Sequence, residues 1–263
     1  MALGIDTCAR LTPERAQKCA AAGVSFVGRY LVPPGMDKEL TAAEAAAIRA
    51  AGLAILLCWE LDARRAASGA AVGAKDGARA AALAHELGVP PGVTIYFAVD
   101  YVPPAGEYGA IEAYLRAAAA ACRPYACGLY GPYDIVEAMA ERCAAAHFWQ
   151  CVGGSGGRVS PRANVYQSHW QGSLEAAALA ERLGFAVDLD ECADLAAAGL
   201  WLPDKPAPWY ADTMAWALKE GVITEERPED PATRAEVVQM LRNYNRRFEA
   251  EDARPVGGII TDD

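Results

Sequence analysis

The sequence predicts an α/β protein whose main part is an irregular TIM-like (β/α) barrel of eight strands and about five helices. Three observations support this prediction. The chain has 263 residues and is 53% hydrophobic, which is enough for one barrel and a small additional module. Short runs rich in apolar, β-branched and aromatic residues recur along residues 3–190. Helix-forming stretches separate most of these runs, as parallel strands with right-handed connections require.

The first three strands are expected at residues 3–8, 25–31 and 53–60. Two helices are expected between them. Thr12-Pro13-Glu14 opens the first helix with proline at its first position, and Thr41-Ala-Ala-Glu44 forms a capping box that opens the second. The second helix ends near Gly52, because glycine commonly follows the last turn of a helix.

In the fourth predicted strand, residues 94–101, strand-favouring residues lead to Asp100. Pro103-Pro104 then prevent the strand from continuing. A carboxylate at the carboxyl end of a buried strand lies where α/β proteins place their ligands. The neighbouring elements are expected to be helices at about 72–87, 106–122 and 132–145, with a fifth strand at 125–130.

The pattern becomes irregular after the sixth predicted strand, residues 148–152. The glycine-rich segment 153–157 and Ser160-Pro161 stand where a helix would otherwise follow. Strands at 163–168 and 185–190 complete the eight, and one short helix is expected at about 174–183. The last strands of the barrel are therefore expected to be joined mainly by loops.

The C-terminal part is expected to be separate from the barrel domain, residues 1–201. The proline-rich segment 202–208 predicts a linker. A small helical module is expected at 209–248, with amphipathic helices over 209–221 and 232–247. The polar segment 249–263 is expected to be a flexible tail.

Composition excludes several classes of partner and site. With 24 basic and 34 acidic residues, the net charge of -10 disfavours nucleic acid. No apolar run approaches the roughly 18–20 residues that cross a bilayer, so membrane insertion is not expected. The eight cysteines and three histidines form no metal-binding pattern, and we expect core thiols and neither a metal nor an organic cofactor. The amino terminus has no secretory pattern, which predicts synthesis in the cytoplasm without a signal peptide.

Four acidic residues lie at or near the carboxyl ends of predicted strands: Asp6, Glu60, Asp100 and Asp188. Because these ends meet at one face of a barrel, the four are candidate catalytic residues. Crowded carboxylates suit either a cation site or a general acid beside an ionised partner, and glycoside hydrolysis needs the second arrangement. The alternative is that each acid caps a helix or faces solvent. Asp62, Asp190 and Glu191 are expected at the rim or on the surface.

Other polar and aromatic residues near the same strand ends are candidates for binding a sugar: Arg29, Tyr30, Tyr101, Tyr130, Trp149, Gln150 and Gln167. Because side chains alternate between the two faces of a strand, only about half of these residues can face a shared pocket. Core packing is the alternative for each aromatic side chain. Arg29 is expected to pair with one of the acids and to keep it ionised.

Several segments of residues 3–201 carry a family resemblance: Gly4-Ile-Asp-Thr-Cys8, Val27-Gly-Arg-Tyr-Leu-Val-Pro33, Ile95-Tyr-Phe-Ala-Val-Asp-Tyr101, Gly128-Leu-Tyr-Gly131, His147-Phe-Trp-Gln150 and Val187-Asp-Leu-Asp-Glu191. This part of the chain resembles a bacterial and phage family described as glycoside-hydrolase-like, a relative of the family 25 lysozymes. Those lysozymes have a barrel of eight strands and five helices and cleave peptidoglycan between its amino sugars.

The resemblance implies that Asp6, Asp100 and Asp188 occupy acid positions of the lysozymes. The lysozymes carry their catalytic glutamate two residues after the acid of the fourth strand, and this chain has Val102 there. Glu60 matches a family glutamate on the third strand. Our hypothesis from the sequence is that Glu60 replaces the missing proton donor.

The C-terminal part also carries a resemblance, in Tyr210-Ala-Asp212, Ala215-Trp-Ala217, Gly221-Val-Ile223 and Thr233-Arg-Ala-Glu236. It resembles a single S-layer-homology module of the kind that binds secondary wall polymers. The alternative is a helical hairpin that docks on the barrel or dimerises.

These resemblances predict a peptidoglycan-directed glycoside hydrolase, a lysozyme-like endolysin or wall-remodelling enzyme. Its expected partner is peptidoglycan or another cell-wall glycan, and it would reach the bacterial wall after release or non-classical export. The main alternative is a catalytically inactive protein that binds wall glycan on a hydrolase scaffold, because Val102 replaces the acid. A hydrolase of another glycan is a third interpretation.

Overall fold

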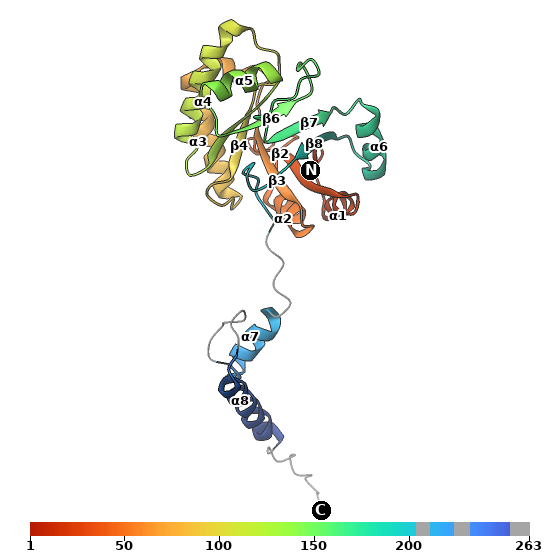
Figure 1. Ribbon diagram of the computed structural model, residues 1–263, viewed down its shortest axis with the longest axis vertical. Helices are drawn as coiled ribbons and strands as arrows, with labels where there is room; N and C mark the ends of the chain where they lie inside the picture. Colours follow the sequence, from red (N-terminus) through yellow and green to blue (C-terminus); the bar gives the residue numbers. More distant parts are fainter. Residues whose placement is uncertain (204–210, 224–231, 253–263) are drawn as a thin grey trace, which may run out of the picture. The chain divides into compact units, whose positions relative to one another are not determined.

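The computed structural model describes residues 1–203, 211–223 and 232–252, which belong to two compact units, Met1–Asp204 and Lys205–Asp263 (Figure 1). The first unit is a closed barrel of eight neighbouring strands in chain order. The strands are β1 (Ala2–Asp6), β2 (Val24–Tyr30), β3 (Ala54–Trp59), β4 (Thr94–Ala98), β5 (Ala126–Gly131), β6 (His147–Cys151), β7 (Val165–His169) and β8 (Asp188–Cys192). The predicted irregular TIM-like barrel is confirmed.

The sequence predicted parallel pairing of the strands throughout the barrel, but the last strand runs in the opposite direction. Strands β1 to β7 pair in parallel, whereas β8 is antiparallel to both β7 and β1. A connection that leaves and re-enters a sheet at the same end makes its two strands antiparallel. The segment after β7, which contains α6 (Leu174–Leu183), is such a connection. β8 therefore begins at the end of the barrel where the other strands finish.

The five helices expected in the first two-thirds of the barrel are α1 (Pro13–Ala21), α2 (Ala42–Ala50), α3 (Ala70–Glu86), α4 (Tyr108–Ala121) and α5 (Tyr133–Glu141). In Figure 1, α3, α4 and α5 lie along one side of the barrel, and α6 lies beside β7 and β8 on the other. Helix α1 begins at Pro13 as the sequence predicts, and Thr12 Oγ1 accepts from Arg15 N and caps it. Thr41 Oγ1 likewise caps α2, but the Glu44 side chain turns to Arg29 instead of completing the capping box.

The apolar core has two layers, one between the strands and the helices and one inside the barrel. Phe26, Leu56 and Tyr96 fill the interior layer. The chain after β8 closes the bottom of the barrel, because Trp201 exchanges two backbone hydrogen bonds of 2.9 Å with Ile55. The interior is thus packed at one end and open only at the end where the parallel strands finish.

Gly199 makes this closure possible. Its φ is +69°, and a Cβ at this position would lie 2.1 Å from Thr94 Oγ1. The Gly199 carbonyl accepts from Thr94 N at 2.7 Å, so the closing segment is bonded directly to the start of β4. Only glycine combines this backbone conformation with such a close approach.

In the second unit, the described residues form α7 (Ala211–Lys219) and α8 (Arg234–Asp252). Thr233 Oγ1 accepts from Glu236 N at 3.2 Å, and Glu236 Oε2 accepts from Thr233 N at 2.7 Å, which is a reciprocal cap at the start of α8. Helix α8 extends into the segment expected to be a tail, while residues 253–263 lie outside the described part. Most of the predicted linker, from residue 204 onward, also lies outside it. No described helix combines the length and apolarity needed to span a membrane.

Candidate active site

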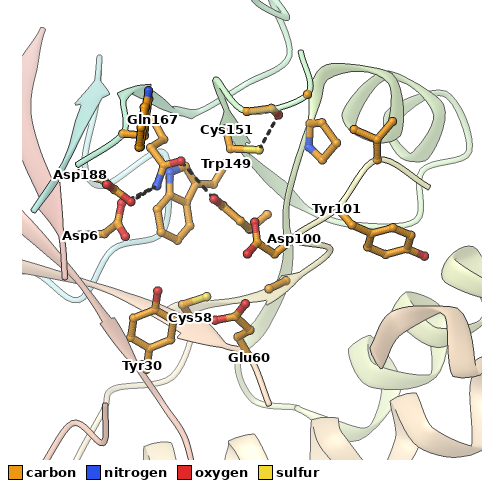
Figure 2. Close-up of a pocket in the computed structure, with 17 residues that line it drawn as sticks. Asp6, Tyr30, Cys58, Glu60, Asp100, Tyr101, Trp149, Cys151, Gln167 and Asp188 are labelled. Carbon is orange, nitrogen blue, oxygen red and sulfur yellow. Dashed lines mark hydrogen bonds between the residues drawn. The ribbon is translucent and has the colours of Figure 1, made fainter. Parts of the chain in front are cut away.

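A cavity of about 360 Å³ occupies the open end of the barrel, and all four predicted acids line it (Figure 2). Asp6 is the last residue of β1, while Glu60 and Asp100 follow β3 and β4. Because these strands are parallel, the three side chains reach the same end. Asp188 reaches it for a different reason: it is the first residue of the antiparallel strand β8, and the register places it opposite Asp6. The sequence predicted that Asp188 lies near the carboxyl end of its strand, but Asp188 lies at the amino end.

Asp6 and Asp188 share one side-chain donor on one side of the cavity (Figure 2). Gln167 Nε2 lies 2.7 Å from Asp6 Oδ2 and 3.2 Å from Asp188 Oδ2. Tyr130 donates its hydroxyl proton to Gln167 Oε1 at 3.1 Å, which orients the amide nitrogen toward the acids. The backbone N–H of Gln171 donates to Asp188 Oδ1 at 2.5 Å. This side of the cavity therefore holds two carboxyl groups in fixed positions.

Asp190 lies beneath this pair and is completely buried, so its expected position at the rim is wrong. Trp149 Nε1 donates to Asp190 Oδ1 at 2.8 Å, whereas Oδ2 has no donor among the described residues. A buried ionised carboxylate with an unpaired oxygen is very costly. Burial without a second donor therefore favours the neutral, protonated form of Asp190. The two-residue spacing from Asp188 to Asp190 is the sequence signal, because it places both side chains on one face of β8.

Asp6 is also buried, and its burial changes its protonation. Burial, followed by the charge of Asp188, raises the pKa of Asp6 to about 7, although the hydrogen bond from Gln167 opposes the rise. Burial and the neighbouring charge of Asp6 also raise the pKa of Asp190 well above its usual range. Loss of hydration raises the pKa of Asp188. These three carboxyl groups thus hold at least one proton at neutral pH.

The opposite side of the cavity carries Asp100 and Glu60 (Figure 2). Lys38 Nζ lies 2.6 Å from Glu60 Oε2 and 4.1 Å from the centre of the Tyr30 ring. Asp100 is exposed at the mouth, but the cavity wall removes part of its hydration and raises its pKa. The charge of Glu60 adds to this rise, and Lys38 opposes it. Sequence reasoning missed Lys38, because no motif marks this loop position.

Aromatic side chains form much of the remaining wall, and the candidates Tyr30, Tyr101, Tyr130 and Trp149 all line the cavity. The rings of Tyr130 and Trp149 lie 4.4 Å apart between centres. Trp170, which follows β7, also lines the cavity and is 60% exposed. The sequence shows a tryptophan near a strand end here but carries no sign of its exposure. Exposed aromatic faces beside carboxyl groups suit the binding of a sugar ring.

Comparison with known proteins identifies the family of the chain. Residues 17–182 match the model of the Rv2525c-like, glycoside hydrolase-like domain family. The chain belongs to this family. The matched range includes Glu60 and Asp100 and ends before β8. No curated protein matches the chain.

Two solved structures share the fold of this glycoside hydrolase-like domain. The Tat-secreted protein Rv2525c of Mycobacterium tuberculosis, in complex with L-tartrate, is 23% identical with a TM-score of 0.65, and the match covers 76% of this chain and 98% of that one. An uncharacterized protein of B. stearothermophilus is 22% identical with a TM-score of 0.56, covering 76% and 100% of the two chains. At these identities the likeness concerns the fold.

Two predicted binding residues of the glycoside hydrolase-like domain lie behind the strands and not in the cavity. Arg29 is completely buried and pairs with Glu44 at 2.8 Å, so it does not pair with a cavity acid as expected. Gln150 Nε2 donates to the Arg158 carbonyl at 2.7 Å, and Gln150 Oε1 accepts from Ser160 N at 2.7 Å. Strand alternation explains both corrections, because the neighbours Tyr30 and Trp149 take the inward positions.

All eight cysteines of the glycoside hydrolase-like domain are free thiols, and two of them, Cys58 and Cys151, line the cavity. Burial raises the pKa of the Cys151 thiol to about 12, which makes it a poor nucleophile. Within the described residues, no three His, Cys, Asp or Glu side chains are arranged to hold a metal ion. The carboxyl groups of the cavity are its main candidates for acid–base chemistry.

Proposed function

We propose that the cavity binds a cell-wall glycan and that the barrel hydrolyses a glycosidic bond of peptidoglycan. One observation carries the proposal: the cavity contains a proton-holding carboxyl group, Asp6 above Asp190, and a separate exposed carboxyl group, Asp100. Two carboxyl groups in different environments are what glycoside hydrolysis requires. The aromatic wall supports a sugar as the ligand.

Asp6 is the proposed proton donor. Its pKa of about 7 suits a general acid that works near neutral pH. The proton of Asp6 passes to the glycosidic oxygen as the bond between that oxygen and the anomeric carbon breaks. The Asp100 carboxylate stabilises the positive charge on the sugar. A water molecule then adds its hydroxyl to the anomeric carbon and returns its proton to a cavity carboxylate, so that one bond is cleaved and one water is consumed.

Glu60, the donor suggested by the sequence, has a different environment. Its Oε2 is bonded to the Lys38 ammonium at 2.6 Å. We therefore assign Glu60 to positioning Lys38 and balancing charge at the mouth. Glu60→Gln should keep measurable wall clearing, whereas a loss of clearing as large as that of Asp6→Asn would restore Glu60 as the donor.

The test measures clearing of purified cell walls and binding to the same walls in a pull-down. Asp6→Asn and Asp100→Asn should each slow clearing by about 10²-fold or more while wall binding persists. Asp37→Asn, at an exposed position outside the cavity, is the matched control and should clear walls at the wild-type rate. If the wild-type protein clears no walls, the hydrolytic proposal is overturned.

Val102 favours a second candidate function, that of a catalytically inactive protein that binds wall glycan. It lines the cavity two residues after Asp100, where the lysozymes that the chain resembles carry their catalytic acid, and it is 60% exposed. Under this alternative, the protein binds walls without clearing them, and Asp100→Asn changes neither result.

We also propose that residues 209–248 form a wall-attachment module joined to the barrel domain, residues 1–201, by the linker at 202–208. The S-layer-homology resemblance supports this module, and the reciprocal Thr233–Glu236 cap begins its second helix. Its proposed ligand is a secondary wall polymer, and the protein would act at the wall after release or export. The full chain should bind intact walls more strongly than walls stripped of secondary polymer by acid. Equal binding to both would contradict this role.

A further inference from the structure

A second hollow adjoins the main cavity. It has a volume of about 210 Å³ and shares Asp6, Tyr30 and Asp188 with the main cavity. Its other lining residues belong to the loop after β1, the turn after β7 and the loop before β8, namely Thr7, Cys8, Ala9, Gln171, Ala186 and Val187. We call this hollow the side arm. The proposed proton donor therefore lies at a junction between two hollows.

Hydrogen bonds hold the walls of the side arm in place. Thr7 Oγ1 donates to the Ala186 carbonyl at 2.7 Å and so joins the loop after β1 to the loop before β8. Ala9 N donates to Thr7 Oγ1 at 3.0 Å. Behind this wall, the buried Arg29 donates from Nη1 to the Thr7 carbonyl at 2.5 Å. The side arm is thus formed in advance, which reduces the entropy that a ligand must overcome to bind there.

The side arm and the main cavity offer different chemistry. The main cavity has several aromatic faces, whereas Tyr30 is the one aromatic residue lining the side arm. The side arm otherwise presents small or polar side chains, including Thr7 and Gln171. Such a wall suits hydrogen bonds to hydroxyl and acetamido groups, while the aromatic wall suits the faces of sugar rings. An oligosaccharide has both kinds of surface.

We propose that the side arm is a further glycan subsite, so that the ligand is a linear oligosaccharide with sugar units on both sides of Asp6, Tyr30 and Asp188. This inference rests on the proposed function of the main cavity and specifies its substrate. The ligand is the interior of a glycan chain and not a single terminal sugar. The bond next to Asp6 then joins the unit in the side arm to the unit in the main cavity.

Cys8 provides a direct probe of the side arm. Cys8 and Cys143 are the two exposed cysteines of the chain, the other six being buried, and Cys143 lines neither hollow. The experiment treats the full chain with N-ethylmaleimide and follows alkylation of each cysteine by peptide mass spectrometry. A tetrasaccharide of peptidoglycan and the monosaccharide N-acetylglucosamine are compared, and calorimetry measures the binding of each ligand independently.

A tetrasaccharide present at about ten times its dissociation constant should slow alkylation of Cys8 about tenfold, because only the free protein reacts. Alkylation of Cys143 should keep its rate. If the tetrasaccharide binds and Cys8 reacts at its original rate, the side arm is not a subsite, while the proposed function stands. Equal protection of Cys8 by the bound monosaccharide would also overturn the inference. If the tetrasaccharide does not bind and walls are not cleared, the proposed function fails as well.

A substitution in the side arm supplies a second measurement. Ala186 is exposed there, and Ala186→Trp places a large side chain in the hollow. This variant should lose tetrasaccharide affinity and keep the affinity of the wild-type protein for the monosaccharide. Ala146→Trp, at another exposed alanine that lines neither hollow, is the matched control. Unchanged tetrasaccharide affinity in Ala186→Trp, with the fold intact by circular dichroism, would overturn the inference.

Discussion

Asp6 and Asp188 lie opposite each other in the antiparallel pairing of β1 with β8, and the side-chain amide of Gln167 donates to both. The hydroxyl of Tyr130 fixes the direction of that amide. Two acids that repel each other when both are ionised are thus held together by one oriented donor. The protonation of Asp6 therefore depends on Gln167, which belongs to β7 and not to the paired strands β1 and β8.

Removal of the shared donor should raise the pKa of Asp6 further. In Gln167→Leu, the Asp6 carboxylate loses its hydrogen bond at 2.7 Å while burial and the charge of Asp188 remain. Carboxyl-carbon NMR titration should show the midpoint of Asp6 above about 7. The control Gln171→Leu keeps the backbone donor of Asp188 and should leave the midpoint in place. An unchanged midpoint in Gln167→Leu would show that the amide does not control this proton.

The neutral state of Asp190 can be tested with two substitutions. Asp190→Asn can still accept from Trp149 and has the shape of a neutral Asp190, so its free energy of unfolding at neutral pH should equal or exceed that of the wild type. Asp190→Leu leaves Trp149 Nε1 buried without an acceptor and should cost about 1–3 kcal/mol. Guanidinium denaturation measures both values. A loss in the asparagine variant as large as in the leucine variant would indicate that Asp190 is ionised.

The protonation of Asp6 should also make stability depend on pH. The pKa of Asp6 is 3.8 ordinarily and about 7 in the fold, so between these values the folded protein binds a proton that the unfolded chain has lost. Stability contributed by this group therefore falls as pH rises through that window, by on the order of 4 kcal/mol in total. Asp6→Asn should flatten the dependence measured by denaturation. Asp37→Asn should keep the wild-type slope, and an equally steep slope in Asp6→Asn would contradict the assignment.

The buried pair of Arg29 and Glu44 should be essential to stability although it lies outside the cavity. Their side chains are 0% and 1% exposed, so Arg29→Met leaves an unpaired buried carboxylate and should cost about 3–5 kcal/mol. The double variant with Glu44→Leu should recover part of this loss. Arg158→Met breaks a pair whose partners are each 49% exposed and should cost no more than about 1 kcal/mol. Similar losses of stability in Arg29→Met and Arg158→Met would contradict the expected difference between a buried and an exposed ion pair.

Restoring an acid at residue 102 should increase hydrolysis. The Val102 side chain is exposed at the cavity, so glutamate fits there without entering the core. In the Asp6→Asn background, which lacks the proposed proton donor, Val102→Glu places a carboxyl group two residues after Asp100 and should raise the rate of wall clearing by about 10²-fold or more by serving as a general acid. Val102→Gln has the same shape without the acid and should show no increase. Equal rates in the two variants would mean that residue 102 does not face the scissile bond.

The order of apolar strands and helices was enough to predict the barrel, because burial imposes a period on the sequence that is visible without coordinates. The same pattern placed Asp6, Glu60 and Asp100 at one end of the barrel, since parallel strands finish together. The local sequence also predicted that α1 begins at Pro13, because residues close in the chain set this start.

The tertiary structure decided whatever depends on contacts between distant residues. The reversed direction of β8 brings Asp188 opposite Asp6, and this direction follows from where the connection after β7 ends, not from the residues of β8. Which of two adjacent residues faces inward is set by strand register, so Arg29 and Gln150 lie behind their strands. The depth of Asp190 likewise depends on packing across the barrel, and that packing controls where the proton resides.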